Sequence, residues 1–221
     1  SKDSVTVTIP TAKRPTDGEV AVIVHEDGSR EVVKNSVPTE RGMRVTLRGS
    51  CNLEIVDNSR HFSDVPEGYW AYDAITFVSG RNLFNGCDSG FMPADAMSRA
   101  MFYTVLARLN GKDTSKGETW YSAAMSWAKE TGISDGTAPF TSITREQLAV
   151  MLYRYAGSPE IGSLPFDIFP DAGDVSAWAG NAMLWAVNSG ILKGSEGNLK
   201  PGGTATRAEV ATMIMRFIEI L

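Results

Sequence analysis

Hydrophobic and polar residues follow two different periods along this chain of 221 residues. Up to about residue 60, short apolar or alternating stretches favour β-strands, because a period of two places every second side chain on one face. The Asp27-Gly28 pair fits the turn of a hairpin, since glycine accepts a positive φ without a steric penalty. Five short strands predict a small β-sandwich or barrel over residues 1–60. These strands are expected at 5–9, 20–24, 31–33, 43–47 and 53–56.

From His61 onward the spacing of apolar residues is helical, and three stretches of the chain run in register. In each stretch a Trp precedes a Gly by 16 residues, at 70–86, 120–136 and 178–194. A Ser/Thr-Arg pair follows each Gly, and the Trp-to-Arg spacing is 29, 25 and 29 residues. A unit written three times cannot bury its apolar face alone, so the three units are expected to pack together. We divide the chain into a β unit, 1–60, and repeats over 61–111, 112–160 and 161–221.

Each repeat is predicted to hold two helices. The first follows the Trp and ends twelve residues after it, where Asn82, Gly132 and Gly190 suit a left-handed C′ position. The second covers 98–109, 144–155 and 206–217, and a Ser or Thr stands at each N-cap. Gln147 and Glu209 complete capping boxes at the N3 position, which gives both side chains a structural role.

The arginine that follows each N-cap residue is the main candidate for ligand binding. A cation at N1 meets the positive end of the helix dipole, so a threefold recurrence of this unfavourable placement points to function. A guanidinium beside the N–H groups of a helix end forms an anion site. A structural salt bridge, to Asp64, Asp171 or a carboxylate of another repeat, is the alternative, and both interpretations stay open. A second arginine recurs nine residues on (Arg108, Arg154, Arg216), and a solvated helix face explains it.

The tryptophan of each repeat also has two interpretations. A Trp at the start of an amphipathic helix is usually part of the core. An aromatic ring beside an arginine that binds anions is also a platform on which a sugar ring stacks. The two interpretations are compatible, with one ring face packed and an edge that lines a groove.

Composition and charge exclude several classes of function. The net charge is −5 and the pI about 5.1, without the clustered Lys and Arg that nucleic acid binding needs. No apolar run approaches the roughly 20 residues that span a bilayer. The first four residues are not a signal peptide, so we expect a piece of a longer protein or a cytosolic protein. Two cysteines, Cys51 and Cys87, are too few for a disulfide scaffold, although one bridge between them is an alternative.

Three sets of residues carry a resemblance to the S-layer homology family. Phe62-Ser63-Asp64-Val65, Trp70 to Ile75, Phe91-Met92-Pro93 and Ser98-Arg99-Ala100 resemble one S-layer homology motif. The segment from Trp120 through Thr144-Arg145-Glu146-Gln147 resembles a second motif. A third motif is resembled by four segments: Phe169-Pro170-Asp171, Trp178-Ala179, 190–194 and Thr206-Arg207-Ala208-Glu209. The resemblance covers about residues 61–221 and does not extend to 1–60.

The resemblance implies an all-α, three-pronged, pseudo-threefold trimer of repeats with grooves between neighbours, preceded by the small all-β unit. Such domains anchor a larger, secreted surface protein non-covalently to the bacterial cell wall or S-layer. Their partner is a secondary cell-wall polysaccharide with pyruvylated N-acetylmannosamine, or peptidoglycan, without a cofactor or metal. In the family the arginine contacts the acidic ketal and the Trp lines the groove. The residues implied are Arg99, Arg145, Arg207, Trp70, Trp120 and Trp178, with Asp64, Asp171, Gly86, Gly136 and Gly194 as lesser members.

The chain departs from the family pattern in its middle and first repeats. The middle repeat lacks the opening Phe-x-Asp-Val, and its loop is four residues shorter. Met101 stands in the first repeat where the motif has Glu. Not every groove is therefore expected to be active. A structural subunit whose repeats mediate protein–protein assembly is the second hypothesis, and an enzyme is a distant third. His25 and His61 are far apart, and no catalytic or metal-binding constellation is visible.

Overall fold

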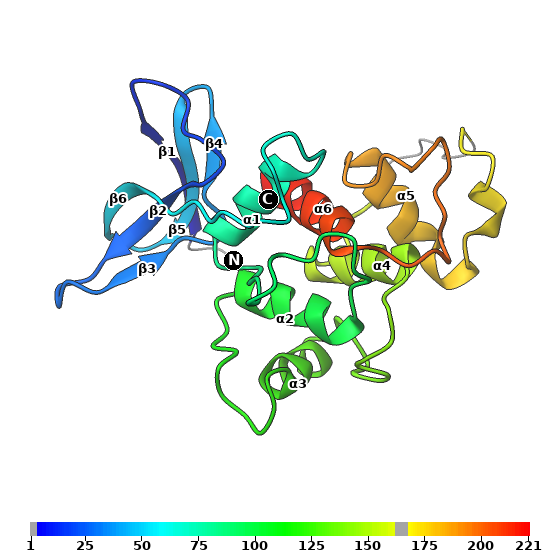
Figure 1. Cartoon of the computed structure of the whole chain (residues 1–221). Helices are drawn as coiled ribbons and strands as arrows, with labels where there is room; N and C mark the ends of the chain where they lie inside the picture. Colours follow the sequence, from blue (N-terminus) through cyan, green and yellow to red (C-terminus); the bar gives the residue numbers. More distant parts are fainter. Residues whose placement is uncertain (1–3, 162–167) are drawn as a thin grey trace. The chain divides into compact units, whose positions relative to one another are not determined.

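The structure is a computed structural model in which residues 4–161 and 168–221 are described (Figure 1). The chain forms two compact units, Ser1–Pro93 with Leu221, and Ala94–Ile220. Residues 1–3 of the expected β unit and 162–167 of the expected third repeat lie outside the described part. Within that part, two three-stranded antiparallel sheets and six α-helices are found.

The first unit contains both sheets. One has the strand order β1-β5-β4 and the other β3-β2-β6. Ala21, Val33, Met43 and Val45 form a buried cluster, and Met43 and Val45 lie on the same face of β5 because side chains alternate along a strand. The β2–β3 hairpin turns at Gly28, whose φ is +79°, as predicted. The strands are β1 (Ser4–Pro10), β2 (Glu19–Val24), β3 (Arg30–Val32), β4 (Val37–Thr39), β5 (Gly42–Arg48) and β6 (Asn52–Asp57).

Helix α1 (Tyr72–Gly80) belongs to the same unit as the strands. Arg81, directly after it, is completely buried. Its guanidinium donates hydrogen bonds to the carbonyl oxygens of Asp17 (2.8 Å), Ser36 (2.7 Å) and Phe77 (2.9 Å). The Arg81 Cζ atom also lies 3.4 Å from the centroid of the Phe77 ring. A buried cation that donates to several carbonyl groups ties the end of α1 to loops between the strands.

The expected fold class, an all-α pseudo-threefold trimer, is therefore wrong. The chain combines two antiparallel sheets with helices, and α1 packs in one unit with the strands instead of in a separate helical body. The physical cause is visible at Arg81, which takes its hydrogen-bond partners from residues 17–36. Isolated β-bridges also occur between residues 87 and 206, where only helices and loops were expected.

The second unit holds the other helices. They are α2 (Arg99–Leu109), α3 (Ser122–Glu130), α4 (Arg145–Tyr155), α5 (Gly180–Asn188) and α6 (Arg207–Ile220), with 3₁₀ turns η1 (Ala172–Asp174) and η2 (Ala177–Ala179). The predicted ends of the first helices are confirmed, since Asn82, Gly132 and Gly190 have φ values of 54°, 71° and 70°. The helices begin two residues after each Trp, at Tyr72, Ser122 and Gly180.

A closed ring of main-chain hydrogen bonds joins the three segments that precede α2, α4 and α6. The N–H of Met97 donates to the carbonyl of Ala205, that of Ala205 to Ile143, and that of Ile143 to Met97, at 2.8–3.1 Å. All three residues are buried. Each segment supplies one donor and one acceptor, so the buried N–H and carbonyl groups of all three residues have a hydrogen-bond partner.

Candidate functional site

The N-terminal ends of α2, α4 and α6 are capped as the sequence predicted. The hydroxyls of Ser98, Thr144 and Thr206 each accept a hydrogen bond from the N3 backbone N–H. The side-chain oxygens of Gln147 and Glu209 accept a hydrogen bond from the N-cap backbone N–H and complete the two capping boxes. These two polar side chains are thus confirmed as structural.

Most of the remaining N–H groups at these helix ends are already paired. The N–H groups of Arg99 and Ala100 donate to the carbonyls of Thr141 (3.0 Å) and Pro139 (2.8 Å). In α4, the corresponding groups of Arg145 and Glu146 donate to Gly203 and Pro201, both at 3.0 Å. The N–H of Arg207 donates to the carbonyl of Asp95 at 2.9 Å. The N1 and N2 N–H groups of α2 and α4 and the N1 N–H group of α6 are therefore not available to an anion, so at α2 and α4 the guanidinium is the remaining donor for an anion.

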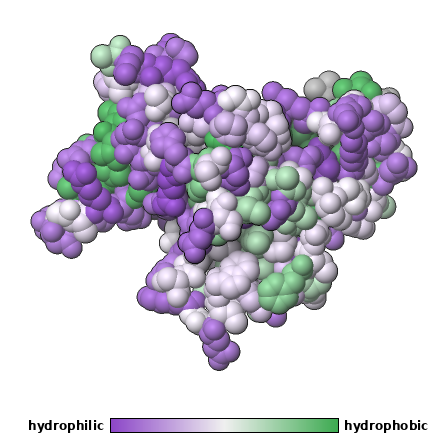
Figure 2. All heavy atoms as spheres, viewed as in Figure 1, coloured by the Kyte–Doolittle hydropathy of each residue, from purple (hydrophilic) through white to green (hydrophobic). Residues whose placement is uncertain are grey.

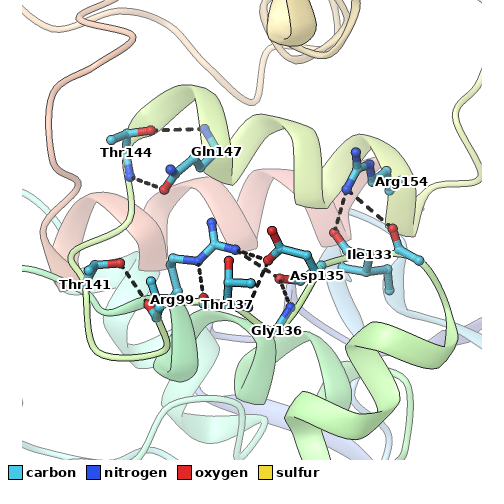
Figure 3. Close-up of polar contacts among 12 residues, drawn as sticks. Arg99, Ile133, Asp135, Gly136, Thr137, Thr141, Thr144, Gln147 and Arg154 are labelled. Atoms are coloured by element: carbon cyan, nitrogen blue, oxygen red, sulfur yellow. Dashed lines mark hydrogen bonds and ion pairs between the residues drawn. The ribbon is translucent and has the colours of Figure 1, made fainter.

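Arg99 projects from the first turn of α2 toward the loop between α3 and α4 (Figure 3). Its Nε donates to the carbonyl of Thr137 at 3.1 Å, and its Nη2 donates to Ser134 Oγ at 3.3 Å. Nη2 also lies 2.7 Å from Asp135 Oδ1, in an ion pair whose aspartate is 63% exposed. Within the described residues Nη1 of Arg99 has no hydrogen-bond partner. One edge of the guanidinium is fixed while another donor remains available.

A cavity of about 320 Å³ opens beside Arg99. Arg154 from α4 lines it and donates weakly from Nη1 to the carbonyls of Gly132 (3.5 Å) and Ile133 (3.4 Å). Figure 3 shows Arg99 and Arg154 approaching residues 133–137 from two directions. Trp178, 59% exposed, also contributes to the lining. The cavity thus combines two cations, one carboxylate and one aromatic ring, a mixture suited to a small polar ligand with an anionic group.

The carboxylate of Asp135 stays charged in this cavity. The N–H of Thr137 donates to its Oδ1 at 3.0 Å, and this backbone hydrogen bond together with the Arg99 charge holds the pKa of Asp135 below its usual range. The two arginines outnumber the aspartate, so the charged groups of the lining sum to a net positive charge.

Arg145 has a different environment from Arg99. Its side chain is 6% exposed, and Nη1 lies 3.2 Å from Glu209 Oε1. Its Nε donates to the carbonyl of Leu199 at 2.8 Å. Burial lowers the pKa of Arg145, and the charges of Glu209 and Asp171 oppose that shift. These contacts match the alternative of a structural salt bridge at this one arginine. Arg207 Nη1 lies 4.0 Å from Met101 Sδ.

The three predicted tryptophans are exposed to solvent. Trp70, Trp120 and Trp178 expose 63%, 52% and 59% of their surface, and all precede their helices instead of packing on the helical face. The core positions of the third repeat are taken by Ala182, Met183, Trp185 and Ala186. Trp70, Asp64 and Gly86 belong to the first unit, whereas the residues that line the Arg99 cavity all belong to the second.

Asp64 and Asp171 have equivalent structural contacts. Asp171 accepts hydrogen bonds from the N–H groups of Leu199 (2.8 Å) and Lys200 (2.7 Å). Asp64 likewise accepts hydrogen bonds from the N–H groups of Phe91 (2.9 Å) and Met92 (2.7 Å). Lys200 and Met92 both have a left-handed backbone, with φ of 51° and 59°. Each aspartate therefore holds a strained loop, and its contact with a ligand stays a prediction.

The three loop glycines are close to neighbouring side chains. A Cβ at Gly86 would lie 2.3 Å from Phe62, and at Gly194 2.8 Å from Phe169, the two phenylalanines that open their motifs. At Gly136 it would lie 2.6 Å from Lys129 Cδ. Gly136 and Gly194 also have positive φ values of 71° and 78°. Their contacts explain why glycine is needed, and a ligand-binding role for them stays a prediction.

Sequence reasoning missed four polar residues that line the Arg99 cavity: Ser134, Asp135, Gln147 and Arg154. The signal for Arg154 was present, because an arginine recurs nine residues after each N1 arginine, but it was interpreted as a solvated helix face. No periodicity points to Asp135, since it lies in the shortened middle loop.

Two general properties complete the description. Among the described residues, no group of three His, Cys, Asp or Glu side chains is placed to hold a metal ion, and Cys51 and Cys87 are unpaired thiols. None of the helices in the described ranges has the length and apolar character needed to cross a bilayer.

The model of the S-layer homology domain matches residues 61–100 and 168–211. These two regions are thus similar to S-layer homology domains. They fall in the expected first and third repeats, and the middle repeat lies between them, so the count of three stays a prediction.

Known relatives include enzymes and surface-layer proteins. The exoglucanase XynX of Acetivibrio thermocellus is 30% identical over 75% of this chain and 17% of its own length. An amylopullulanase of Thermoanaerobacterium thermosulfurigenes is 32% identical over 72% of this chain and 9% of its own length. A surface-layer 125 kDa protein of Lysinibacillus sphaericus is 29% identical over 68% of this chain and 14% of its own length. The chain spans less than a fifth of each relative. These matches indicate a location at the cell surface, in the cell wall or S-layer, and support anchoring to the cell envelope.

Proposed function

We propose that the repeats expected at 61–111, 112–160 and 161–221 anchor a larger surface protein by binding an acidic, pyruvylated secondary cell-wall polysaccharide. The observation that carries this proposal is the cavity of about 320 Å³ in which Arg99, Arg154 and Trp178 meet. The segment acts as a binding module, and we assign it no catalytic residue and no cofactor.

The charges of the cavity support an anionic ligand. Arg99 has a donor without a partner among the described residues, and its other two nitrogens are held by Thr137, Ser134 and Asp135. A guanidinium that is already oriented loses little conformational freedom when it binds a carboxylate. The pyruvyl ketal supplies such a carboxylate, and Arg154 adds a second positive charge to the same cavity.

The exposed ring of Trp178 supports a sugar as the carrier of that carboxylate. A pyranose presents a face of C–H groups, which packs on an aromatic face, while its hydroxyls stay in contact with polar groups. Gln147, at the edge of the same cavity, can exchange hydrogen bonds with a hydroxyl or an acetamido group. One cavity of this size accommodates about one sugar residue.

The other expected site residues divide into two groups. Arg207, Trp70 and Trp120 remain candidates for contacts with the polymer outside the Arg99 cavity. Arg145 has buried partners, so we propose that it stabilises the second unit instead of binding the polymer.

Calorimetric titration with purified wall polysaccharide tests the proposal. Arg99→Ala is expected to weaken binding by about ten- to a hundredfold, because a charge-assisted hydrogen bond contributes about 1.5–3 kcal/mol. Arg99→Lys is expected to recover only part of the loss, since it lacks the bidentate fork. Lys112→Ala removes an exposed charge outside the cavity and is the control. Unchanged affinity in Arg99→Ala, with an unchanged thermal melt, would contradict the proposal and favour protein–protein assembly.

A further inference from the structure

Three aromatic rings gather on the surface of the second unit, outside the Arg99 cavity. The ring centroids of Trp120 and Tyr121 are 5.3 Å apart, and those of Tyr121 and Phe140 are 5.2 Å apart, both in edge-to-face contact. Trp120 is 52% exposed and Phe140 is 67% exposed, while Tyr121 between them is half-buried. We name these three residues the aromatic patch. Figure 2 shows pale and green surface where α3 and the loop that follows it lie in Figure 1.

The demands of the core do not account for the aromatic patch. Phe140 lies five residues before Arg145, and the corresponding positions before Arg99 and Arg207 are Ala94 and Gly202. The exposed phenylalanine is thus particular to the shortened middle loop. Apolar side chains clustered at the surface mark interaction sites when they form a contiguous patch.

The loop that carries Phe140 also builds the Arg99 cavity. The carbonyl of Thr137 accepts from Arg99 Nε, and the carbonyls of Pro139 and Thr141 accept from the N–H groups of Ala100 and Arg99. Phe140 therefore stands between two residues that are hydrogen-bonded to the first turn of α2. These bonds hold the loop that carries Phe140 beside the first turn of α2, from which Arg99 reaches the cavity.

We propose that the aromatic patch is a second carbohydrate subsite, for the neutral sugar residues next to the acidic one in the same polysaccharide chain. The proposal rests on the proposed function above. A cavity of about 320 Å³ cannot hold a polymer, so a chain bound through its acidic sugar must continue over the neighbouring surface. The patch carries no charge of its own, and ring faces of Trp, Tyr and Phe suit the C–H faces of neutral sugars.

The experiment compares ligand lengths on the full chain. The single pyruvylated sugar and defined fragments of two to six sugar residues are titrated against the unmodified protein, Phe140→Ala and Tyr121→Ala. Both variants are expected to bind the single sugar with unchanged affinity and the longest fragment about three- to tenfold more weakly. Ile220→Ala, which removes a side chain with 50% exposure outside the patch, is the matched control and is expected to change neither affinity. The fluorescence of Trp120, followed by comparison with Trp120→Phe, is expected to respond only to the longer fragments.

The outcomes separate this inference from the proposed function. Binding of the polymer that depends on Arg99 but not on fragment length, Phe140 or Tyr121 overturns the subsite and leaves the anchoring proposal standing. Failure of the unmodified protein to bind any fragment overturns both. A change in self-association on sedimentation of Phe140→Ala, without a change in glycan affinity, overturns the subsite and assigns the patch to protein–protein contact. If Tyr121→Ala unfolds, Phe140→Ala decides, because its side chain is mostly in solvent.

Discussion

Arg99 and Arg145 occupy the same position of their helices but have different surroundings. Arg99 pairs with an exposed aspartate beside a cavity, whereas Arg145 is buried against Glu209 and the carbonyl of Leu199. The local sequence is the same at the N-cap and N1 positions of both helices except for Ser in place of Thr. The chain-distant partners therefore decide whether an N1 arginine is available to a ligand, and no motif within one repeat can distinguish the two.

A tyrosine under the surface near these residues gives a prediction about stability. Tyr103 is completely buried, and its hydroxyl has no hydrogen-bond partner within the described part of the chain. Burial also raises the pKa of Tyr103. Because an unsatisfied buried hydroxyl costs about 1–3 kcal/mol, Tyr103→Phe is expected to leave the free energy of unfolding unchanged or to raise it by about 1 kcal/mol. Urea denaturation measures this change.

Tyr153→Phe is the matched control for that substitution. The Tyr153 hydroxyl donates to the carbonyl of Pro159 at 2.9 Å, so its removal is expected to lower the free energy of unfolding by about 1 kcal/mol. Equal destabilisation by both substitutions would show that the Tyr103 hydroxyl has a partner after all.

At the scale of elements, the sequence predicted helices better than their surroundings. The left-handed Asn82, Gly132 and Gly190 and the capped second helices follow from local chemistry, and both are confirmed. β4 was missed because three residues with a central proline carry no periodic signal, although Pro38 is tolerated on an edge strand. The helices begin two residues after each Trp, because the exposed ring belongs to the turn before the helix.

The loop held by Asp171 gives a prediction about pH. Burial raises the pKa of this carboxyl, but hydrogen bonds from the N–H groups of Leu199 and Lys200, with the charge of Arg145, lower it overall. A carboxyl whose pKa is lower in the folded state stabilises the fold above its unfolded pKa of about 3.9, and this contribution is lost as the pH falls through the folded value. Asp171→Asn is therefore expected to destabilise at pH 6 and to differ progressively less from the unmodified protein below pH 4.

Urea denaturation of both proteins between pH 6 and pH 3 measures this difference. Asp174→Asn, an exposed neighbour in η1, is the control and is expected to leave the profile unchanged. A difference between Asp171→Asn and the unmodified protein that stays constant over the whole range would contradict the role of this carboxylate.

At the scale of the whole molecule, the strands and α1 belong to one compact unit. Residues 17–36 supply carbonyl partners to Arg81, and Asn58 donates to the carbonyl of Gly80 at 2.5 Å. The change of periodicity near residue 61 correctly marked where strands give way to helices. It could not indicate which elements pack together, because long-range hydrogen bonds leave no periodic trace in the sequence.

Arg81→Met tests this connection. The methionine fills part of the volume but leaves the carbonyls of Asp17, Ser36 and Phe77 without their donor, so the free energy of unfolding is expected to fall by about 3 kcal/mol. Hydrogen exchange is expected to accelerate across α1, and urea denaturation gives the magnitude. Arg41→Met, at an exposed position, is the control. A small loss of stability, equal to that of the control, would show that α1 does not depend on these bonds.

The ring of hydrogen bonds through Met97, Ile143 and Ala205 affects the order in which the second unit folds. Its members are spread over more than 100 residues of chain, and each bond needs a different pair of them. Contacts between residues so far apart in sequence slow folding, because the entropy cost of closing the loop comes before the contact stabilises the chain. A nascent chain that stops before Ala205 leaves both other segments with an unfilled bond. The second unit can thus complete its native hydrogen bonding only after Ala205 has been synthesised, and the segment before α6 is the last part of the ring to be added.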